Sequence, residues 1–124
     1  MNNSITHNNM TTVKIASWNL KSFKNNCSFI TNKLFDCDIV LLQETWLHQF
    51  EENLVHTLHP DFLGVSISSI PPGTLVRGRP YGGTAILWKK DISSSITIVD
   101  LKDPRLSAIT LDYKSLKIWL INSS

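Results

Sequence analysis

The sequence predicts an α/β fold in a single domain, from three observations. Two short apolar segments, VKIASWN at 13–19 and IVLLQ at 39–43, flank a stretch whose apolar residues have helical spacing. Strand, helix and strand within about thirty residues is the spacing of a βαβ unit. After residue 83, short apolar segments alternate with turn residues, which predicts antiparallel strands. A chain of 124 residues, 42% hydrophobic and 18% charged, can form one hydrophobic core.

Net charge and cysteine content exclude few functional classes of protein. The net charge of +2 is compatible with nucleic acid as a partner but does not indicate it. Cys27 and Cys37 lie ten residues apart without a CxxC motif, which is typical of reduced thiols. No apolar run approaches the ~18 residues of a membrane helix, and no signal-peptide pattern opens the chain. We therefore expect an intracellular, soluble protein without a membrane partner.

The chain begins with a polar segment, MNNSITHNNMT. We expect residues 1–11 to be a disordered tail and residues 12–124 to be the folded domain. Residues 13–19 alternate between two kinds of side chain, so they predict a short strand with two different faces.

A helix is expected from the N-cap candidates Asn25 and Asn26 to about residue 35. Its apolar stripe contains Cys27, Ile30 and Leu34. Residues 39–43 are continuously apolar before Gln43, as in a central strand covered on both faces. The sequence does not decide whether the strands at 13–19 and 39–43 are neighbours.

Further elements follow in order. A helix is expected at 51–58, ended by Pro60, then a strand at 63–70 and a Pro- and Gly-rich exposed loop at 71–83. Four more short strands are expected, at 84–88, 96–99, 106–111 and 116–121. The four tryptophans are expected in the core: Trp18, Trp46, Trp88 and Trp119.

Two polar residues close the two best strands. Asn19 ends the first and Glu44 directly follows the second, and ligand sites of α/β sheets gather at the carboxyl ends of strands. A carboxylate there needs a hydrogen bond, a counter-charge or a cation. Each residue also has a plain alternative: Asn19 as a turn residue, and Glu44 as an acidic strand end facing water.

Asn19 and Glu44, together with the residues that flank them, belong to recognisable sequence motifs. SWNLKS at 17–22, DIVLLQETWL at 38–47 and GRPYGGTAILWKK at 78–90 occur in this order. Across 13–121, the chain resembles the N-terminal portion of the endonuclease/exonuclease/phosphatase family. Within that family it is most similar to the apurinic-type endonuclease domains of non-LTR retrotransposon polyproteins.

The resemblance implies a fold. The family fold is a two-sheet α/β sandwich with helices outside, of which this chain would supply the first half, a mixed sheet with outer helices, C-terminally truncated. The inner face of that sheet would then lack its partner. Because large uncovered apolar patches are unusual in soluble monomers, we expect self-association through this face or incomplete folding.

The resemblance also implies a site. Glu44 matches the family's metal-binding glutamate and Asn19 its active-site asparagine, so both are expected catalytic and metal-site residues for Mg²⁺ or Mn²⁺. Such an ion needs only one or two carboxylates. Gln43 and Thr45 flank the glutamate and are expected to orient it. Lys21 stands where some members have an acidic residue, and it either approaches substrate phosphate or is a solvated loop residue.

Substrate contacts are expected beside this site. Thr45 is one candidate, and the loop residues Arg77, Arg79 and Tyr81 suit phosphate contact and stacking on a base or sugar of DNA. The alternative for these loop residues is a solvated loop.

The family's later motifs have no match here. Members need an Asp-x-Asn segment and a terminal Asp-His pair that activates water, and no Asp or His of this chain fits them. We therefore expect a DNA endonuclease-type hydrolase fragment that is catalytically incomplete alone. The alternatives are a family phosphatase acting on another phosphoester and a non-catalytic binding remnant. Action on genomic DNA would imply a nuclear location.

Overall fold

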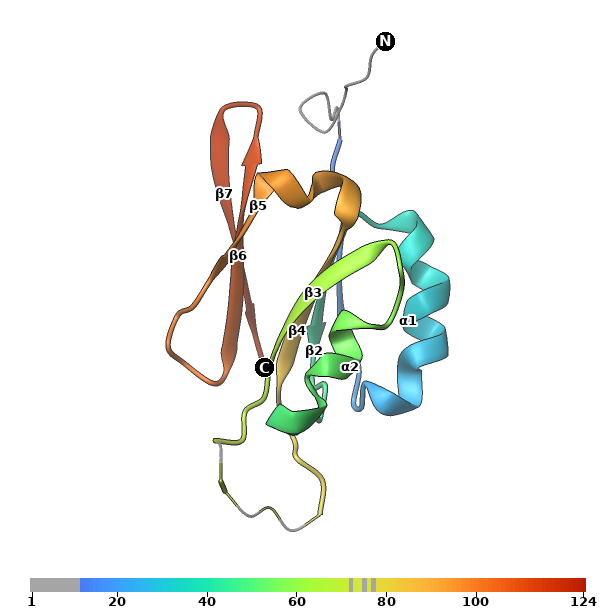
Figure 1. Cartoon of the computed structure of the whole chain (residues 1–124), viewed down its shortest axis with the longest axis vertical. Helices are drawn as coiled ribbons and strands as arrows, with labels where there is room; N and C mark the ends of the chain where they lie inside the picture. The colour runs from blue at the N-terminus through green and yellow to red at the C-terminus, as the bar shows by residue number, and fades with distance from the viewer. Residues whose placement is uncertain (1–11, 72, 75, 77) are drawn as a thin grey trace.

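The computed structural model describes residues 12–71, 73–74, 76 and 78–124, so the predicted tail at 1–11 lies outside the described residues. Within them, seven strands form two sheets that pack face to face, with helices over the outer face of the larger sheet (Figure 1). The strands are β1 (Ile15–Asn19), β2 (Ile39–Gln43), β3 (Phe62–Ile67), β4 (Thr84–Lys89), β5 (Ile96–Val99), β6 (Leu106–Tyr113) and β7 (Leu116–Ser123). The α-helices are α1 (Cys27–Lys33) and α2 (Asn53–His56). The 3-10 helices are η2 (Lys24–Asn26), η3 (Leu34–Asp36), η4 (Gln49–Glu51) and η5 (Lys90–Ser95).

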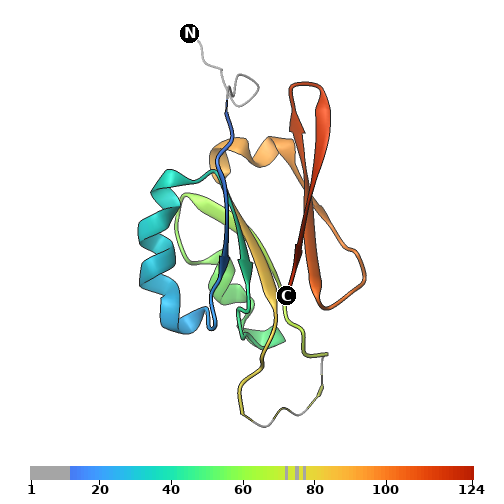
Figure 2. The ribbon, with the colours of Figure 1, turned by 180° about the vertical axis from the view of Figure 1, so that it is seen from behind.

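The larger sheet has four strands in the order β1-β2-β4-β3. β1 and β2 are parallel neighbours, which the sequence left open, and the other pairs are antiparallel (Figure 2). The strand-helix-strand prediction is thus confirmed as a βαβ unit through α1. Because β1 and β2 are parallel and adjacent, their carboxyl ends lie at the same edge of the sheet.

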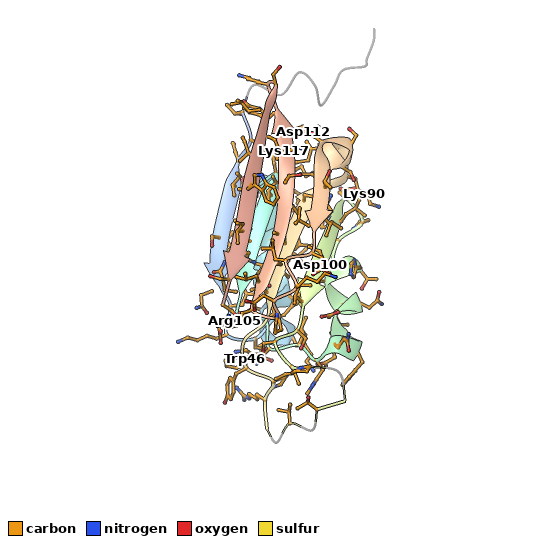
Figure 3. All side chains as sticks on the ribbon, turned by 90° about the vertical axis from the view of Figure 1, so that its left-hand side faces the viewer. Trp46, Lys90, Asp100, Arg105, Asp112 and Lys117 are labelled. Carbon is orange, nitrogen blue, oxygen red and sulfur yellow. The ribbon has the colours of Figure 1, made fainter. Side chains whose placement is uncertain are left out.

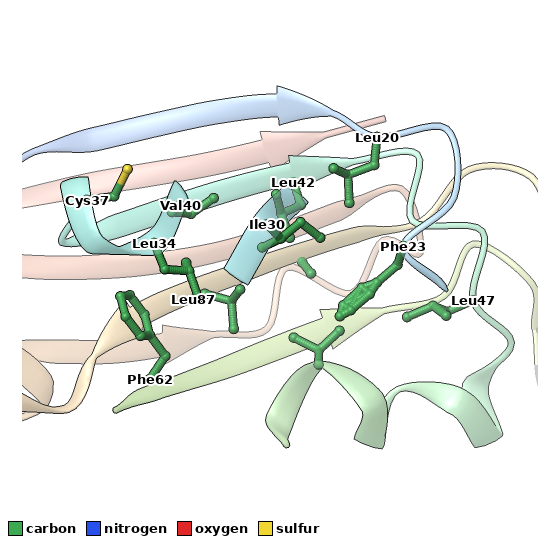
Figure 4. Close-up of a cluster of buried hydrophobic side chains, with 12 residues drawn as sticks. Leu20, Phe23, Ile30, Leu34, Cys37, Val40, Leu42, Leu47, Phe62 and Leu87 are labelled. Carbon is green, nitrogen blue, oxygen red and sulfur yellow. The ribbon is translucent and has the colours of Figure 1, made fainter. Parts of the chain in front are cut away.

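The helices cover one face of the four-stranded sheet. Alternate residues of β2 and β4 point toward α1 and α2, since side chains of a strand alternate between faces. The core on this side contains, among others, Phe23, Ile30, Leu34, Val40, Leu42 and Leu87, each no more than 1% exposed (Figure 4). Gly64 of β3 brings the backbone close to this core, because a Cβ there would lie 2.7 Å from Leu87 Cδ2.

Asn26 occupies the N-cap position of α1, as predicted, whereas Asn25 lies within η2. The side chain of Asn26 makes no cap hydrogen bond. Its side-chain amide instead donates to the carbonyl oxygens of Leu20, at 3.0 Å, and Ser22, at 2.8 Å. Asn26 therefore holds the loop that follows β1 against the start of the helix.

The opposite face of the large sheet is covered by the smaller sheet, of order β5-β6-β7. Figures 1 and 3 show this smaller sheet lying over the larger one. The cluster between the sheets contains Ile39, Ile86, Trp88, Ile92, Ile109 and Leu111, all buried. The expectation of an uncovered inner face is therefore wrong, because β5, β6 and β7, predicted only as short strands, form a second sheet over that face.

The outer face of the smaller sheet also carries exposed apolar side chains. Trp119 is 53% exposed and Ile121 is 57% exposed. The prediction that Trp119 belongs to the core is wrong, whereas Trp88 is 4% exposed and lies between the sheets. Of the helices described, none combines the length and hydrophobicity needed to cross a membrane.

Candidate functional site

The two predicted strand-end residues lie at one edge of the four-stranded sheet. Asn19, the last residue of β1, is the register partner of Gln43, the last residue of β2, and Glu44 follows directly. The Leu20 N–H donates to the Gln43 carbonyl oxygen at 2.9 Å, so the two chains remain paired just beyond the strands. Neighbouring strands are about 4.8 Å apart, so the structure brings these two segments together.

The loops at this edge have an unusual backbone. Four non-glycine residues after β1 and β2 have positive φ: Lys21 at 51°, Ser22 at 107°, Glu44 at 56° and Trp46 at 54°. The left-handed conformation costs an L-residue about 1–2 kcal/mol. Such residues persist only where surrounding contacts determine them, and they cluster at functional sites.

One set of these contacts comes from the loop after β1. The Ser22 N–H donates to the Glu44 carbonyl oxygen at 3.0 Å, and the Phe23 N–H donates to that of Thr45 at 2.8 Å. Phe23 is itself fully buried, so the loop is anchored in the core.

A second set comes from the two glycines before β4. The N–H of Thr45 donates to the Gly83 carbonyl oxygen at 3.3 Å, and that of Trp46 to the Gly82 carbonyl oxygen at 2.9 Å. Gly83 has a φ of +89°, and a Cβ there would lie 2.5 Å from Thr45 Oγ1. The Gly82-Gly83 pair therefore holds the segment that carries Glu44.

The carboxylate of Glu44 is oriented by a neighbouring indole. Trp46 Nε1–H donates to Glu44 Oε1 at 3.0 Å. The indole lies edge-on to the Tyr81 ring, with centroids 4.9 Å apart, and the Arg79 guanidinium lies 5.4 Å from its centroid. Of the predicted substrate-binding residues, Arg79 and Tyr81 are thus brought to the site, whereas Arg77 lies outside the described residues.

Thr45 differs from the expectation. It is 0% exposed and lies beneath Gly83, so its side chain cannot reach a substrate in this conformation. Among the described residues its hydroxyl has no hydrogen-bond partner. Lys21, by contrast, is exposed beside Asn19, where it can approach a phosphate.

Gln43 is held below the site. Its Nε2 donates to Ser17 Oγ at 2.9 Å and to Asn122 Oδ1 at 2.8 Å. Asn122, on β7, in turn donates to the carbonyl oxygens of Leu42 at 2.9 Å and Ala85 at 3.0 Å. Asn122 was not predicted as a site residue, although an amide at the end of an apolar strand is a signal in the sequence.

A hollow lies next to the indole. Its lining includes Lys24, Trp46, His48, Glu51 and Arg79. Lys24 and Glu51 form an ion pair across it. Burial opposes ionisation of Glu51, but the hydrogen bond and charge of Lys24 and the backbone N–H of His48 outweigh it, so the pKa of Glu51 is lowered.

The donor set at the edge suits a hard cation with few protein ligands. Across the described residues there is no group of three or more His, Cys, Asp or Glu that could hold a metal. One carboxylate, Glu44, next to the strand end that carries the exposed Asn19, matches Mg²⁺, which keeps several waters and binds through one or two carboxylates. Zinc-like sites, which need three or four nitrogen or sulfur ligands, do not fit.

Two packed sheets, outer helices and a polar edge where parallel strands end define a two-sheet α/β sandwich with a strand-end site. The chain belongs to the endonuclease/exonuclease/phosphatase family, whose model matches residues 16–114. Among curated protein sequences, none matches.

Solved structures share the fold. A 3′ phosphatase from Neisseria bound to product DNA hairpin is 22% identical, with a TM-score of 0.58 over 90% of this chain and 41% of that one. An AP endonuclease from Leishmania major is 20% identical, with a TM-score of 0.63 over 90% of this chain and 40% of that one. An AP endonuclease from Archaeoglobus fulgidus is 19% identical, with a TM-score of 0.54 over 91% and 41%. The chain thus spans about two fifths of the length of these structures.

Proposed function

We propose that this chain is the metal-carboxylate half of a Mg²⁺-dependent phosphodiesterase that acts on DNA. The observation that carries the proposal is that the ends of β1 and β2 meet. Asn19 pairs in register with Gln43, and the next residue, Glu44, has a left-handed backbone conformation. The family and its DNA-processing structural neighbours support a phosphoester substrate.

Each residue at the edge has a chemical task. The Glu44 carboxylate would hold the cation, and the Asn19 amide would bind beside it or donate to a phosphate oxygen. Bound Mg²⁺, or Mn²⁺ in its place, supplies Lewis-acid polarisation of the phosphodiester. Gln43, through Ser17 and Asn122, keeps the strand end fixed so that these groups need no rearrangement.

DNA would approach along the rim that carries Lys21, Arg79 and Tyr81. Lys21 and Arg79 would pair with backbone phosphates, and Tyr81, 61% exposed, would stack on a base or sugar. Arg77 is proposed for the same role from sequence alone. These contacts are sequence-independent, so affinity should fall as salt rises.

The retrotransposon branch is the favoured origin. The YGGT segment, which carries that resemblance, contacts the family's QET motif and Trp46 through the hydrogen bonds of Gly83 and Gly82 with Thr45 and Trp46. Action on genomic DNA would place the protein in the nucleus.

Hydrolysis needs groups that these 124 residues do not supply. No Asp or His of the chain matches the family's water-activating pair. Loss of general acid-base groups typically lowers a rate by about 10²–10⁴-fold. We therefore infer cation and DNA binding without useful nicking by this chain alone.

The test measures binding and cleavage separately. Mn²⁺ affinity by calorimetry, and plasmid nicking with Mg²⁺, are compared for the wild type, Glu44→Ala and the control Asp91→Ala, which removes an exposed acid of η5. We expect Mn²⁺ binding in the wild type and control, its loss in Glu44→Ala, and no nicking in any. Equal Mn²⁺ binding by Glu44→Ala would refute the metal site. Nicking that Glu44→Ala abolishes would support the nuclease and contradict the inferred incompleteness.

A second candidate is a phosphatase that removes a terminal phosphate. It is favoured by the fold shared with a DNA-bound 3′ phosphatase. Competition of a labelled 3′-phosphorylated hairpin against an internally nicked duplex distinguishes the two, because only the phosphatase reading predicts preference for the terminal phosphate.

A further inference from the structure

We propose that Trp46 is a positioning residue for Glu44, and that Arg79 and Tyr81 act on the carboxylate through the indole. The inference rests on the proposed function in that Glu44 is taken as the metal ligand. Trp46 was expected in the core, yet it belongs to neither buried cluster of the described residues and is only half-buried.

The indole contacts the carboxylate directly. Trp46 Nε1–H donates to Glu44 Oε1 at 3.0 Å. A hydrogen bond to an ionised acceptor is about twice as strong as one between two neutral groups. Because indole is a donor only, it orients the carboxylate without competing for the cation, and it leaves Oε2 available.

The backbone places the two side chains for this contact. Glu44 and Trp46, two residues apart, both have positive φ, at 56° and 54°. The buried Thr45 lies between them. Its N–H donates to the Gly83 carbonyl oxygen, and its own carbonyl oxygen accepts from the Phe23 N–H. This conformation is therefore held from both sides, and the strain is compatible with a functional requirement for the geometry.

The loop residues fix the ring itself. Tyr81 meets Trp46 edge-on, with an interplanar angle of 85°, and Arg79 lies 5.4 Å from the ring centroid. A guanidinium over an indole ring is attracted by the negative charge of the ring face. Tyr81 is in turn tied back, since its carbonyl oxygen accepts from Ser69 Oγ at 2.6 Å.

A consequence is that DNA and cation sites are coupled. Arg79 is proposed to contact phosphate and also rests on the indole that orients Glu44. A phosphate that draws Arg79 from the ring loosens the carboxylate, whereas one bound with Arg79 in place leaves it ordered. Groups that orient a metal ligand typically change metal affinity by about 10–100-fold when removed.

The first test reads the contact without any metal. The four tryptophans give four indole Nε1–H signals in a nitrogen-15 NMR spectrum. Trp46→Phe assigns one of them, and Glu44→Gln should shift that signal while leaving those of Trp18, Trp88 and Trp119 in place. Arg79→Ala should broaden or shift the same signal. An unmoved Trp46 signal in Glu44→Gln would overturn the proposal.

The second test measures Mn²⁺ affinity. Trp46→Phe keeps an aromatic ring but removes the N–H donor, and we expect Mn²⁺ binding to weaken about tenfold. Arg79→Ala should weaken it less. Trp119→Phe, at an exposed tryptophan of β7, is the matched control and should bind as the wild type does.

The outcomes separate the two proposals. Loss of Mn²⁺ binding in Glu44→Ala with wild-type affinity in a folded Trp46→Phe overturns the positioning role and leaves the metal site intact. Wild-type protein that binds no Mn²⁺ overturns both the proposed function and the effect on affinity. Circular dichroism melting of each variant shows whether it is folded. If Trp46→Phe melts early, Trp46→His is measured in its place. Its ring restores an N–H donor and should rescue Mn²⁺ binding.

Discussion

The side-chain amide of Gln43 donates to Asn122 Oδ1 across 2.8 Å and joins two residues that are 79 positions apart. Asn122 is 3% exposed, and its own amide donates to Leu42 of β2 and Ala85 of β4. One buried side chain of the smaller sheet thus ties together the strands of the larger sheet directly below Glu44.

Asn122→Ala should destabilise the protein by roughly 2–4 kcal/mol. Loss of the buried amide removes one hydrogen-bond partner from Gln43 and from the carbonyl oxygens of Leu42 and Ala85. Urea unfolding measures the change. Ser123→Ala, at the exposed next residue of β7, is the control and should stay within about 0.5 kcal/mol of the wild type. Equal stability of the two variants would mean that the bridge contributes nothing.

Gly83→Ala should be more harmful than Gly78→Ala. Both glycines have positive φ, at +89° and +82°, but a Cβ at Gly83 would meet Thr45 Oγ1 at 2.5 Å, whereas at Gly78 it would meet nothing within 4 Å. Gly78→Ala therefore isolates the conformational cost, about 1–2 kcal/mol. Thermal melting should show a larger loss for Gly83→Ala, and a matching loss in both would remove the steric argument.

The pH dependence of stability should reveal Glu52. Burial raises the pKa of Glu52 above its usual 4.5, although the Ser68 N–H opposes this. The folded protein then binds the proton more tightly than the unfolded chain does, so stability falls as pH rises from 4.5 through the raised pKa. Glu52→Gln cannot ionise, and its unfolding free energy relative to the wild type should increase over this window.

Glu51, the preceding residue, should behave oppositely. Its pKa is lowered below 4.5, because Lys24 and the His48 N–H outweigh burial. The stability that it contributes is therefore present above 4.5 and is lost as pH falls through the lowered pKa. Glu51→Gln should lose stability relative to the wild type mainly above that range. If the stability difference between either variant and the wild type did not change with pH, the pKa shift of that glutamate would be contradicted.

The second sheet should be part of the cooperative fold. Ile109 of β6 is fully buried between the sheets, and Ile109→Ala should cost about 2–5 kcal/mol. Leu116→Ala removes the same type of side chain from a position that is 64% exposed and should have little effect. Equal, small losses in both would mean that the sheets do not pack as described.

The sequence predicted the local elements well. Alternation at β1, the apolar run of β2 and the stripe with Ile30 and Leu34 placed the elements within a few residues of their observed bounds. Boundaries differed where turns intervened, as at β3, which ends at Ile67 before the Ser-rich and Pro-rich segment. Such patterns are local, so a short window of sequence is enough to show them.

The site was predicted only in its outline. The polar residues Asn19 and Glu44 stood out because Asn19 ends one strand and Glu44 directly follows the next. The burial of Thr45 and the contact of Trp46 with Glu44 did not, because both depend on positive φ values and on Gly82 and Gly83, nearly forty residues downstream.

By itself, the sequence determined the α/β class, the order of its elements and the family to which its motifs belong, since hydrophobic spacing and turn residues act over short distances. Only the tertiary structure decided that β1 and β2 are neighbours, that a second sheet covers the first, and that Asn122 reaches Gln43. These relationships arise from packing between distant segments, where burial of apolar faces selects one register among several that local patterns allow.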